Sequence, residues 1–168
     1  MTIPDVERYL PRYTRRPFPA YRFVPGKALH PTRDPDGHSY NKTPVQLGIF
    51  KSGDWQSCDE YLYGIDLFNH EYWWEAHEVL EAVWVAAGRR TVTGLFIQGL
   101  IQIAVAHLKW FQGLHDTASR MASEGLEKTK SIKGFYMGIN LEVFRSDVME
   151  YFSGKIKIPV IITLNRSD

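Results

Sequence analysis

The chain of 168 residues has almost no cysteine, since Cys58 is its only one. A single thiol cannot form an internal disulfide, so no framework of bridges holds this fold. Proteins without disulfides are usual in reducing compartments, and we therefore expect a cytoplasmic protein. With 44% hydrophobic and 23% charged residues, the composition suits one globular domain with an ordinary hydrophobic core.

The chain also lacks the marks of a secreted or membrane protein. Residues 1–8 contain no basic stretch followed by an apolar one, so we expect no secretory signal. The longest apolar run, Leu95 to Leu108, is interrupted by Gln98, Gln102 and His107. It is shorter than the roughly 20 residues that cross a bilayer, and we predict a core helix there and no membrane association.

Several motifs of nucleotide and nucleic-acid binding are missing as well. The chain has no G-x-G-x-x-G or G-K-[ST] phosphate loop and no G-x-S-x-G turn around a serine nucleophile. One cysteine cannot supply zinc-finger spacing, and no RNP-like aromatic motif is found. Nucleotide binding and specific nucleic-acid binding therefore have no support.

Charge is balanced overall but divided unevenly along the chain. Residues 1–53 contain nine Lys or Arg and four acids, a net charge of +5, so the net charge of +1 leaves −4 for the rest. A basic arm on an acidic body fits either nucleic-acid contact or docking on its own domain. We favour docking, because the arm lacks an uninterrupted run of basic residues.

Proline is confined almost entirely to the start of the chain, where eight of the nine prolines lie within the first 44 residues. No long helix can form there. The same segment is too aromatic for a solvated linker, so we predict an extended strap that packs on the body through Tyr13, Phe18, Tyr21 and Phe23. The turn-rich stretch from His30 to His38 should be an exposed loop.

From Asp54 onward, apolar residues recur at helical spacing. We predict an all-α helical bundle on a central antiparallel hairpin, with Asn69 and Asn140 as helix caps and Gly88 as a helix end. The tail 156–164 is β-prone but contains Pro159, so strand should be confined to the two termini. The predicted helices are 55–68, 69–87, 90–112, 116–132 and 141–152, and the predicted parts are an arm 1–53, a helical domain 54–154 and an extended tail 155–168.

A polar stripe is predicted along the second helix, at the edge of its core-facing side. At about 100° per residue, the wheel puts Tyr72, Ala76, Val79, Leu80, Val83 and Ala87 toward the core and Glu71, Glu75 and Glu78 opposite. Side chains at the boundary are partly desolvated yet reachable, which suits a ligand site. The stripe consists of His70, Trp74, His77, Glu81 and Trp84.

His77 and Glu81 stand one helical turn apart, close enough to share a metal ion or simply to form a surface ion pair. Their segment resembles the zinc-protease pattern H-E-x-x-H, but the second histidine is replaced by Glu81, so we do not expect a zinc protease. Ferritin-like sites need paired Glu-x-x-His motifs, which do not recur here. Zn, Mn, Fe and Mg all remain candidate metals, with Glu78 or Glu81 as a catalytic base.

The third helix contributes further candidates. His107 is a candidate third metal ligand or an ordinary core histidine. Gln98 and Gln102, together with Trp74 and Trp84, either bind a ligand or form hydrogen bonds across the hairpin, because buried glutamines need partners.

The two helices also carry a family resemblance. A phenylalanine-asparagine pair, then E-A-H-E-x-L-E-x-x-W and then Q-G-L-I-Q resemble the domain of unknown function 309 family over about residues 55–130. The resemblance implies a small all-helical prokaryotic protein and brings no activity, substrate or metal, and Gln112 to His115 replace a Gly-Asn turn frequent in the family. The matching positions are Phe68, Asn69, Glu75, Ala76, His77, Glu78, Leu80, Glu81, Trp84, Gln98, Gly99, Leu100, Ile101 and Gln102.

Two functions stay open at this point. In the first, His77, Glu78 and Glu81 hold a divalent metal or a small polar ligand and support metal-assisted hydrolysis. In the second, the protein is a non-catalytic interaction module whose Trp73, Trp74 and Trp110 form a docking surface, with the stripe as an internal polar network. A small ligand, a protein or a second copy of the chain are the open partners.

Overall fold

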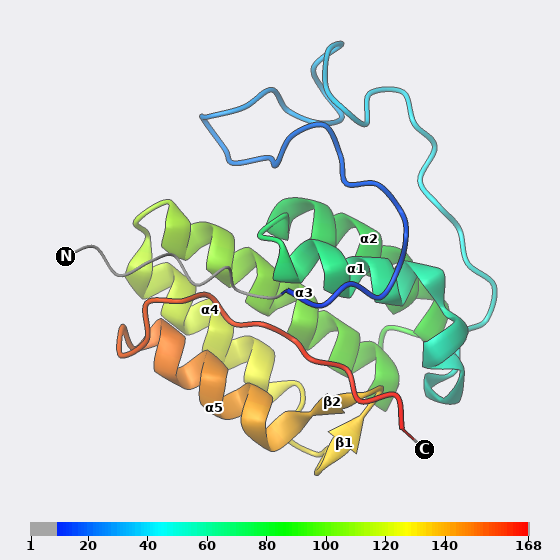
Figure 1. Ribbon diagram of the computed structural model, residues 1–168, viewed down its shortest axis with the longest axis vertical. Coiled ribbons are helices and arrows are strands. Elements are labelled where there is room, and N and C mark those ends of the chain that lie inside the picture. Colours follow the sequence, from blue (N-terminus) through cyan, green and yellow to red (C-terminus); the bar gives the residue numbers. More distant parts are fainter. Residues whose placement is uncertain (1–9, 168) are drawn as a thin grey trace.

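The computed structural model describes residues 10–167 and confirms an all-α bundle with an extended N-terminal strap (Figure 1). The long helices α2 and α3 are joined by residues 88–91 and form the predicted hairpin, with α1 packed on α2 and α4 packed on α3. The elements are η1 (Ser52–Ser57), α1 (Asp59–Asn69), α2 (Trp73–Ala87), α3 (Val92–Phe111), α4 (His115–Glu127), β1 (Phe135–Tyr136), β2 (Ile139–Asn140) and α5 (Leu141–Phe152).

Helix α3 is the core helix that its apolar sequence predicts. By length and composition it could cross a membrane, but 61% of its apolar window is buried inside the protein. Phe96, Ile97, Leu100 and Ile103 are completely buried between the neighbouring helices. Its apolar character therefore serves the hydrophobic core of this bundle.

The predicted start of the second helix, residue 69, is wrong, because residues 70–72 are not helical and separate α1 from α2. Helix α1 ends at Asn69, and Glu71 adopts a left-handed backbone with φ 68°. The Tyr72 and Glu71 amides donate to the Leu67 and Phe68 carbonyls, which closes the last turn of α1. Glycine is the usual residue in a left-handed conformation at a helix end, so the glutamate at position 71 did not indicate in the sequence that a helix ends there. Asn69 is consequently not the cap of α2.

The other helix ends and the strands give a mixed outcome. The Asn140 side chain accepts from the Glu142 and Val143 amides and caps α5 as predicted, and Gly88 ends α2 with φ 85°. The prediction that strand is confined to the termini is wrong: β1 and β2 pair across Met137 and Gly138, both with positive φ. The described tail contains no strand.

The backbones of α3 and α4 approach each other closely at Gly99 and Gly125. A Cβ on Gly99 would lie 2.7 Å from the Gly125 carbonyl oxygen, and a Cβ on Gly125 would lie 2.9 Å from the Gly99 oxygen. Only residues without a side chain allow this approach, so these two glycines set the spacing of the two helices.

Gly99→Ala is therefore expected to lower the free energy of unfolding by about 1–3 kcal/mol, because the methyl group pushes two packed helices apart. Chemical denaturation measures the loss. Gly48→Ala is the matched control, since a Cβ there meets no atom within 4 Å. Equal stability of the two variants would contradict the close packing of α3 on α4.

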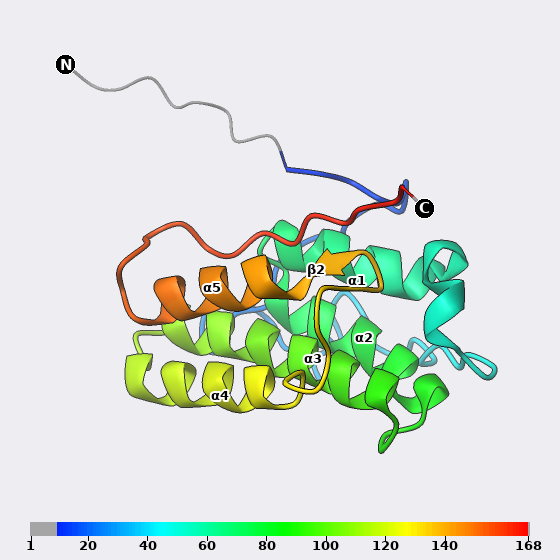
Figure 2. The same ribbon diagram turned by 90° about the horizontal axis from the view of Figure 1, so that it is seen from below.

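Both extended segments of the described chain are fastened to α1, and they lie side by side in Figures 1 and 2. The buried Asp66 carboxylate accepts hydrogen bonds from the backbone amides of Tyr13 and Thr14 at 2.7 and 2.9 Å. The Asn69 amide pairs with both the N–H and the carbonyl of Ile162 at 2.7 and 2.8 Å. Helix α1 thus holds the arm at residues 13 and 14 and the tail at residue 162.

Candidate metal site on helix α2

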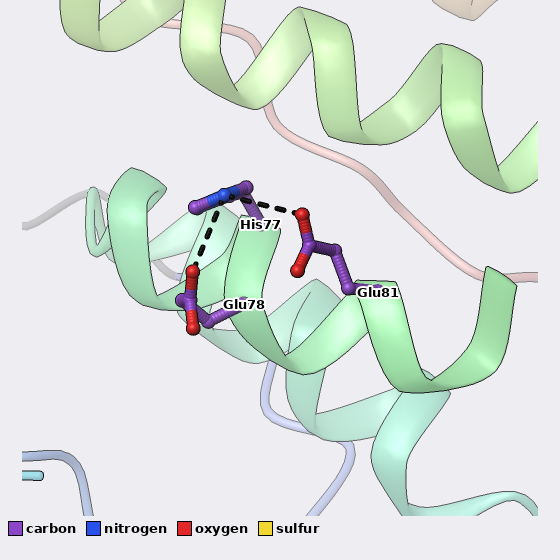
Figure 3. Close-up of side chains that lie close together, drawn as sticks. All are labelled: His77, Glu78 and Glu81. Carbon is purple, nitrogen blue, oxygen red and sulfur yellow. Dashed lines mark ion pairs between the residues drawn. The ribbon is translucent and has the colours of Figure 1, made fainter. Parts of the chain in front are cut away.

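Three of the predicted site residues form a cluster on one side of α2 (Figure 3). His77 Nε2 lies 3.4 Å from Glu78 Oε1 and 3.5 Å from Glu81 Oε1. One ligand atom from each residue lies within 4.8 Å of the other two. His77 and Glu81 meet because residues i and i+4 are neighbours on a helix, and the Glu78 side chain reaches the same nitrogen from the adjacent position.

The hydrogen bond of the other His77 nitrogen determines the tautomer of the neutral ring. Nδ1 lies 2.7 Å from the Trp74 carbonyl oxygen. A carbonyl can only accept, so Nδ1 carries a hydrogen and the neutral ring keeps its lone pair on Nε2. That nitrogen faces the two glutamates. Metal-binding histidines in proteins are commonly oriented by such a hydrogen bond from the distal ring nitrogen.

The two distances from His77 Nε2 are compatible with ligands that share one ion. Ligand atoms at about 2.0–2.2 Å from a tetrahedral metal stand about 3.3–3.6 Å apart. The two distances from Nε2, 3.4 and 3.5 Å, fall in this range. Three donors on one turn of helix leave at least one coordination position for water or a substrate. The side chains of His77, Glu78 and Glu81 are 20%, 43% and 47% exposed, so an ion can reach them from solvent.

Glu78 has the most perturbed surroundings of the three. Partial burial raises the pKa of its carboxyl, His77 lowers it, and the negative charge of Glu81 raises it further. A positive ion between these groups would relieve both the desolvation and the repulsion of the two carboxylates.

Two adjoining cavities of about 590 Å³ each lie between α2 and the arm, and Glu78 lines both of them. Glu81 lines only one of the two, whereas Lys42 and Val45 of the arm line both. Glu78 and Glu81, but not His77, therefore border a space large enough for a small molecule.

His107 is not brought to this cluster. It is completely buried, where its Nδ1–H donates to the Ile103 carbonyl and its Nε2 accepts from the Val160 amide. Its ring stacks on Trp73 and Tyr151 at centroid distances of 5.4 and 4.9 Å. Both nitrogens are used within the core, so the structure gives His107 the role of a core histidine.

The predicted ligand-binding residues of the hairpin are also dispersed. Gln102 lies next to α4: a Cβ atom added to Gly125 would be 3.3 Å from the Gln102 Cβ. Among residues 10–167, no hydrogen bond links Gln98 or Gln102 to His77, Glu81 or an indole, and Trp84 Nε1 is buried without a partner. Trp74 is half-buried beside His77 and lines one of the two cavities under the arm.

The helical wheel did not predict the burial of a second polar group, Glu75, because it placed this residue on the solvent side. Its side chain is 4% exposed, because the arm covers it. Oε1 accepts from the Phe23 amide at 2.7 Å and from His38 Nε2 at 2.9 Å. A helical wheel gives only the direction in which a side chain points. The one sequence feature that indicated burial of this face was the aromatic, proline-rich arm, which had to cover some face of the bundle.

Together these features define a small all-α protein with a His/Glu cluster on its central hairpin. Residues 61–121, fewer than half of the chain, match the family model described as Domain of unknown function (DUF309), so this segment is similar to that family. The match confirms the resemblance and includes His77, Glu78 and Glu81, whereas the arm and the tail lie outside it. No curated protein matches the chain.

Proposed function

We propose that this protein binds a divalent metal ion through His77 and Glu81, with the Glu78 carboxylate beside the ion. The observation that carries the proposal is the His77 ring, whose Nδ1–H is tied to the Trp74 carbonyl so that the lone pair of Nε2 faces two carboxylate oxygens. Without an ion or a proton between them, the lone pair and two negative groups repel one another. One imidazole and two carboxylates suit Zn, Mn and Fe well, and Mg less so.

The chemistry we propose for the bound ion is hydrolysis. A divalent metal lowers the pKa of a coordinated water and makes it a nucleophile near neutral pH. Glu78 is the better placed of the two carboxylates to take the proton, because its raised pKa brings it closer to the range of a general base and because it lines both cavities. Glu81 then serves with His77 as a ligand.

The proposal predicts that Mn, Zn or Mg raises the melting temperature of metal-free protein, since an ion that binds only the folded state stabilises it. His77→Ala and Glu81→Gln should abolish this shift while costing little stability without metal, because both side chains are partly exposed. Thermal melts with and without each ion provide the measurement. Glu124→Gln, an exposed carboxylate on α4, removes the same charge and should keep the full shift.

The interaction-module alternative predicts the opposite pattern. If His77 and Glu81 had only a structural role, through their ion pair and the bond of His77 to the Trp74 carbonyl, removing either would lower the free energy of unfolding in metal-free buffer. That result, combined with no effect of any ion on the parent protein, would refute the metal site.

A further inference from the structure

The two cavities under the arm share part of their wall. Residues that line both cavities lie where the two adjoin, so a molecule that extends from one into the other passes them. Among these residues Arg16 and Lys42 are positive and Glu78 is the only acid, so positive charge exceeds negative by one. We call this set the shared wall, and it consists of Arg16, Thr32, Ser39, Lys42, Val45, Glu78 and Val79.

Arg16 is held in place with part of its guanidinium still available. Its Nη1 donates to Asp59 and Glu60 at 3.1 and 2.9 Å, and the guanidinium carbon lies 3.9 Å from the centre of the Tyr63 ring. Within residues 10–167, no hydrogen bond uses Nη2 or Nε, and the side chain is 37% exposed. A positioned guanidinium with free, reachable N–H groups is a typical binding group for an anion.

Lys42 adds a second donor from the arm. It is exposed and forms no ion pair within the described part of the chain. Its amide donates to the Ser39 carbonyl at 3.2 Å, so one turn of the arm brings the ammonium and a hydroxyl to the shared wall, where Thr32 supplies a second hydroxyl. Guanidinium, ammonium and hydroxyl groups are the side-chain donors with which proteins bind phosphate.

The acids that border the two cavities determine when an anion is favourable there. Glu60 pairs with Arg16 at 2.9 Å, and Glu75 accepts two hydrogen bonds from the arm. Glu78 and Glu81 belong to the candidate metal site, where a divalent ion offsets both of their charges. Attraction for an anion is therefore strongest when the ion is bound.

We propose that the shared wall binds the phosphate group of a small organic phosphate, with Arg16 and Lys42 as donors and the ion beside Glu78 as the third contact. A phosphate has three acceptor oxygens and can face all three groups at once, whereas a carboxylate has only two. The apolar body of the ligand lies against Val45 and Val79. This inference rests on the proposed function, because the ion supplies part of the attraction, and it names the class of ligand for that site.

The test uses phenyl phosphate as the probe and phenol, which lacks the phosphate, as the matched ligand control. Both are titrated calorimetrically into the full chain, metal-free and with Mn, after subtraction of the heat of Mn with each compound alone. We expect saturable binding of phenyl phosphate to the protein with Mn and affinity at least about tenfold weaker without the ion. Phenol should not bind at the same concentrations.

A variant then tests the contact with the arm. Lys42→Gln removes one charge at an exposed position and should weaken phenyl phosphate binding about tenfold, while it keeps the full Mn-dependent rise in melting temperature. Lys133→Gln, an exposed lysine that lines neither cavity, should bind as the parent does.

The outcomes separate this inference from the proposed function. Absence of saturable phenyl phosphate binding in a parent protein that Mn stabilises would overturn the inference and leave the metal site standing. Equal affinity of the parent and Lys42→Gln, or equal affinity for phenyl phosphate and phenol, would overturn it as well. Phenyl phosphate binding that depends on Lys42 in a protein that no ion stabilises would support the phosphate contacts and refute the metal site.

Discussion

Replacing Asp66 with alanine is expected to lower the free energy of unfolding by about 3 kcal/mol and to release the N-terminal arm. The carboxylate is completely buried and accepts from the Tyr13 amide, the Thr14 amide and the Thr14 hydroxyl, with Arg12 Nε 3.3 Å away. Alanine removes every one of these acceptor sites. The freed arm would then expose the surface that Phe18 and Phe23 cover.

Chemical denaturation and limited proteolysis together measure this effect. Asp66→Asn keeps one acceptor oxygen without the charge and should fall between the parent and Asp66→Ala. Asp36→Ala, an exposed acid of the same arm, should change little. If protease removed the arm of the parent protein at once without loss of stability, docking would be refuted, and the basic arm would again be a candidate for nucleic-acid contact.

Acidification is expected to destabilise the protein through His107, by about 3 kcal/mol between pH 6.5 and 4. Burial lowers the pKa of this histidine from 6.5 to about 4, partly offset by the Ile103 carbonyl. A folded-state pKa below the unfolded value means that the unfolded chain binds the proton first. Stability is therefore complete above pH 6.5 and is lost as the pH falls toward 4. At about 1.4 kcal/mol per pH unit, a shift of this size gives the quoted loss.

The geometry explains where the acid effect acts. Protonation of Nε2 replaces its lone pair by a hydrogen that points at the Val160 amide, so the contact between α3 and the C-terminal tail becomes a repulsion between two donors. His107→Phe cannot titrate. Comparing denaturation curves of parent and variant from pH 7 to 4 isolates the effect, because the carboxylates titrate alike in both. Parallel pH profiles would show that His107 does not contribute.

Hydrophobic periodicity predicted the helices and the hairpin well, because the core positions repeat clearly along α2 and α3. The pair of His77 and Glu81 was equally predictable, since residues i and i+4 of one helix are neighbours, whereas the wheel had placed Glu78 on the side opposite the core. Its function as a metal site stays a proposal.

The rest depended on information that one helix does not contain. Glu71 adopts a conformation usual for glycine, so the break between α1 and α2 carried no signal. Glu75 is buried by the arm, and His107 is satisfied by the tail, and both coverings come from residues at least 37 positions away in the chain. A helical wheel gives the direction of a side chain, whereas its burial depends on which distant segment packs there.

The pairing of arm and tail on α1 also bears on how the protein folds. The Leu164 amide donates to the Tyr13 hydroxyl across a separation of 151 residues, so this contact closes a loop of nearly the whole chain. The chain entropy lost in closing so long a loop is compensated only once the helices between the two segments have formed. The hairpin of α2 and α3, by contrast, needs only contacts between neighbouring elements. We therefore expect folding to start from the hairpin, and the arm and the tail to join α1 last.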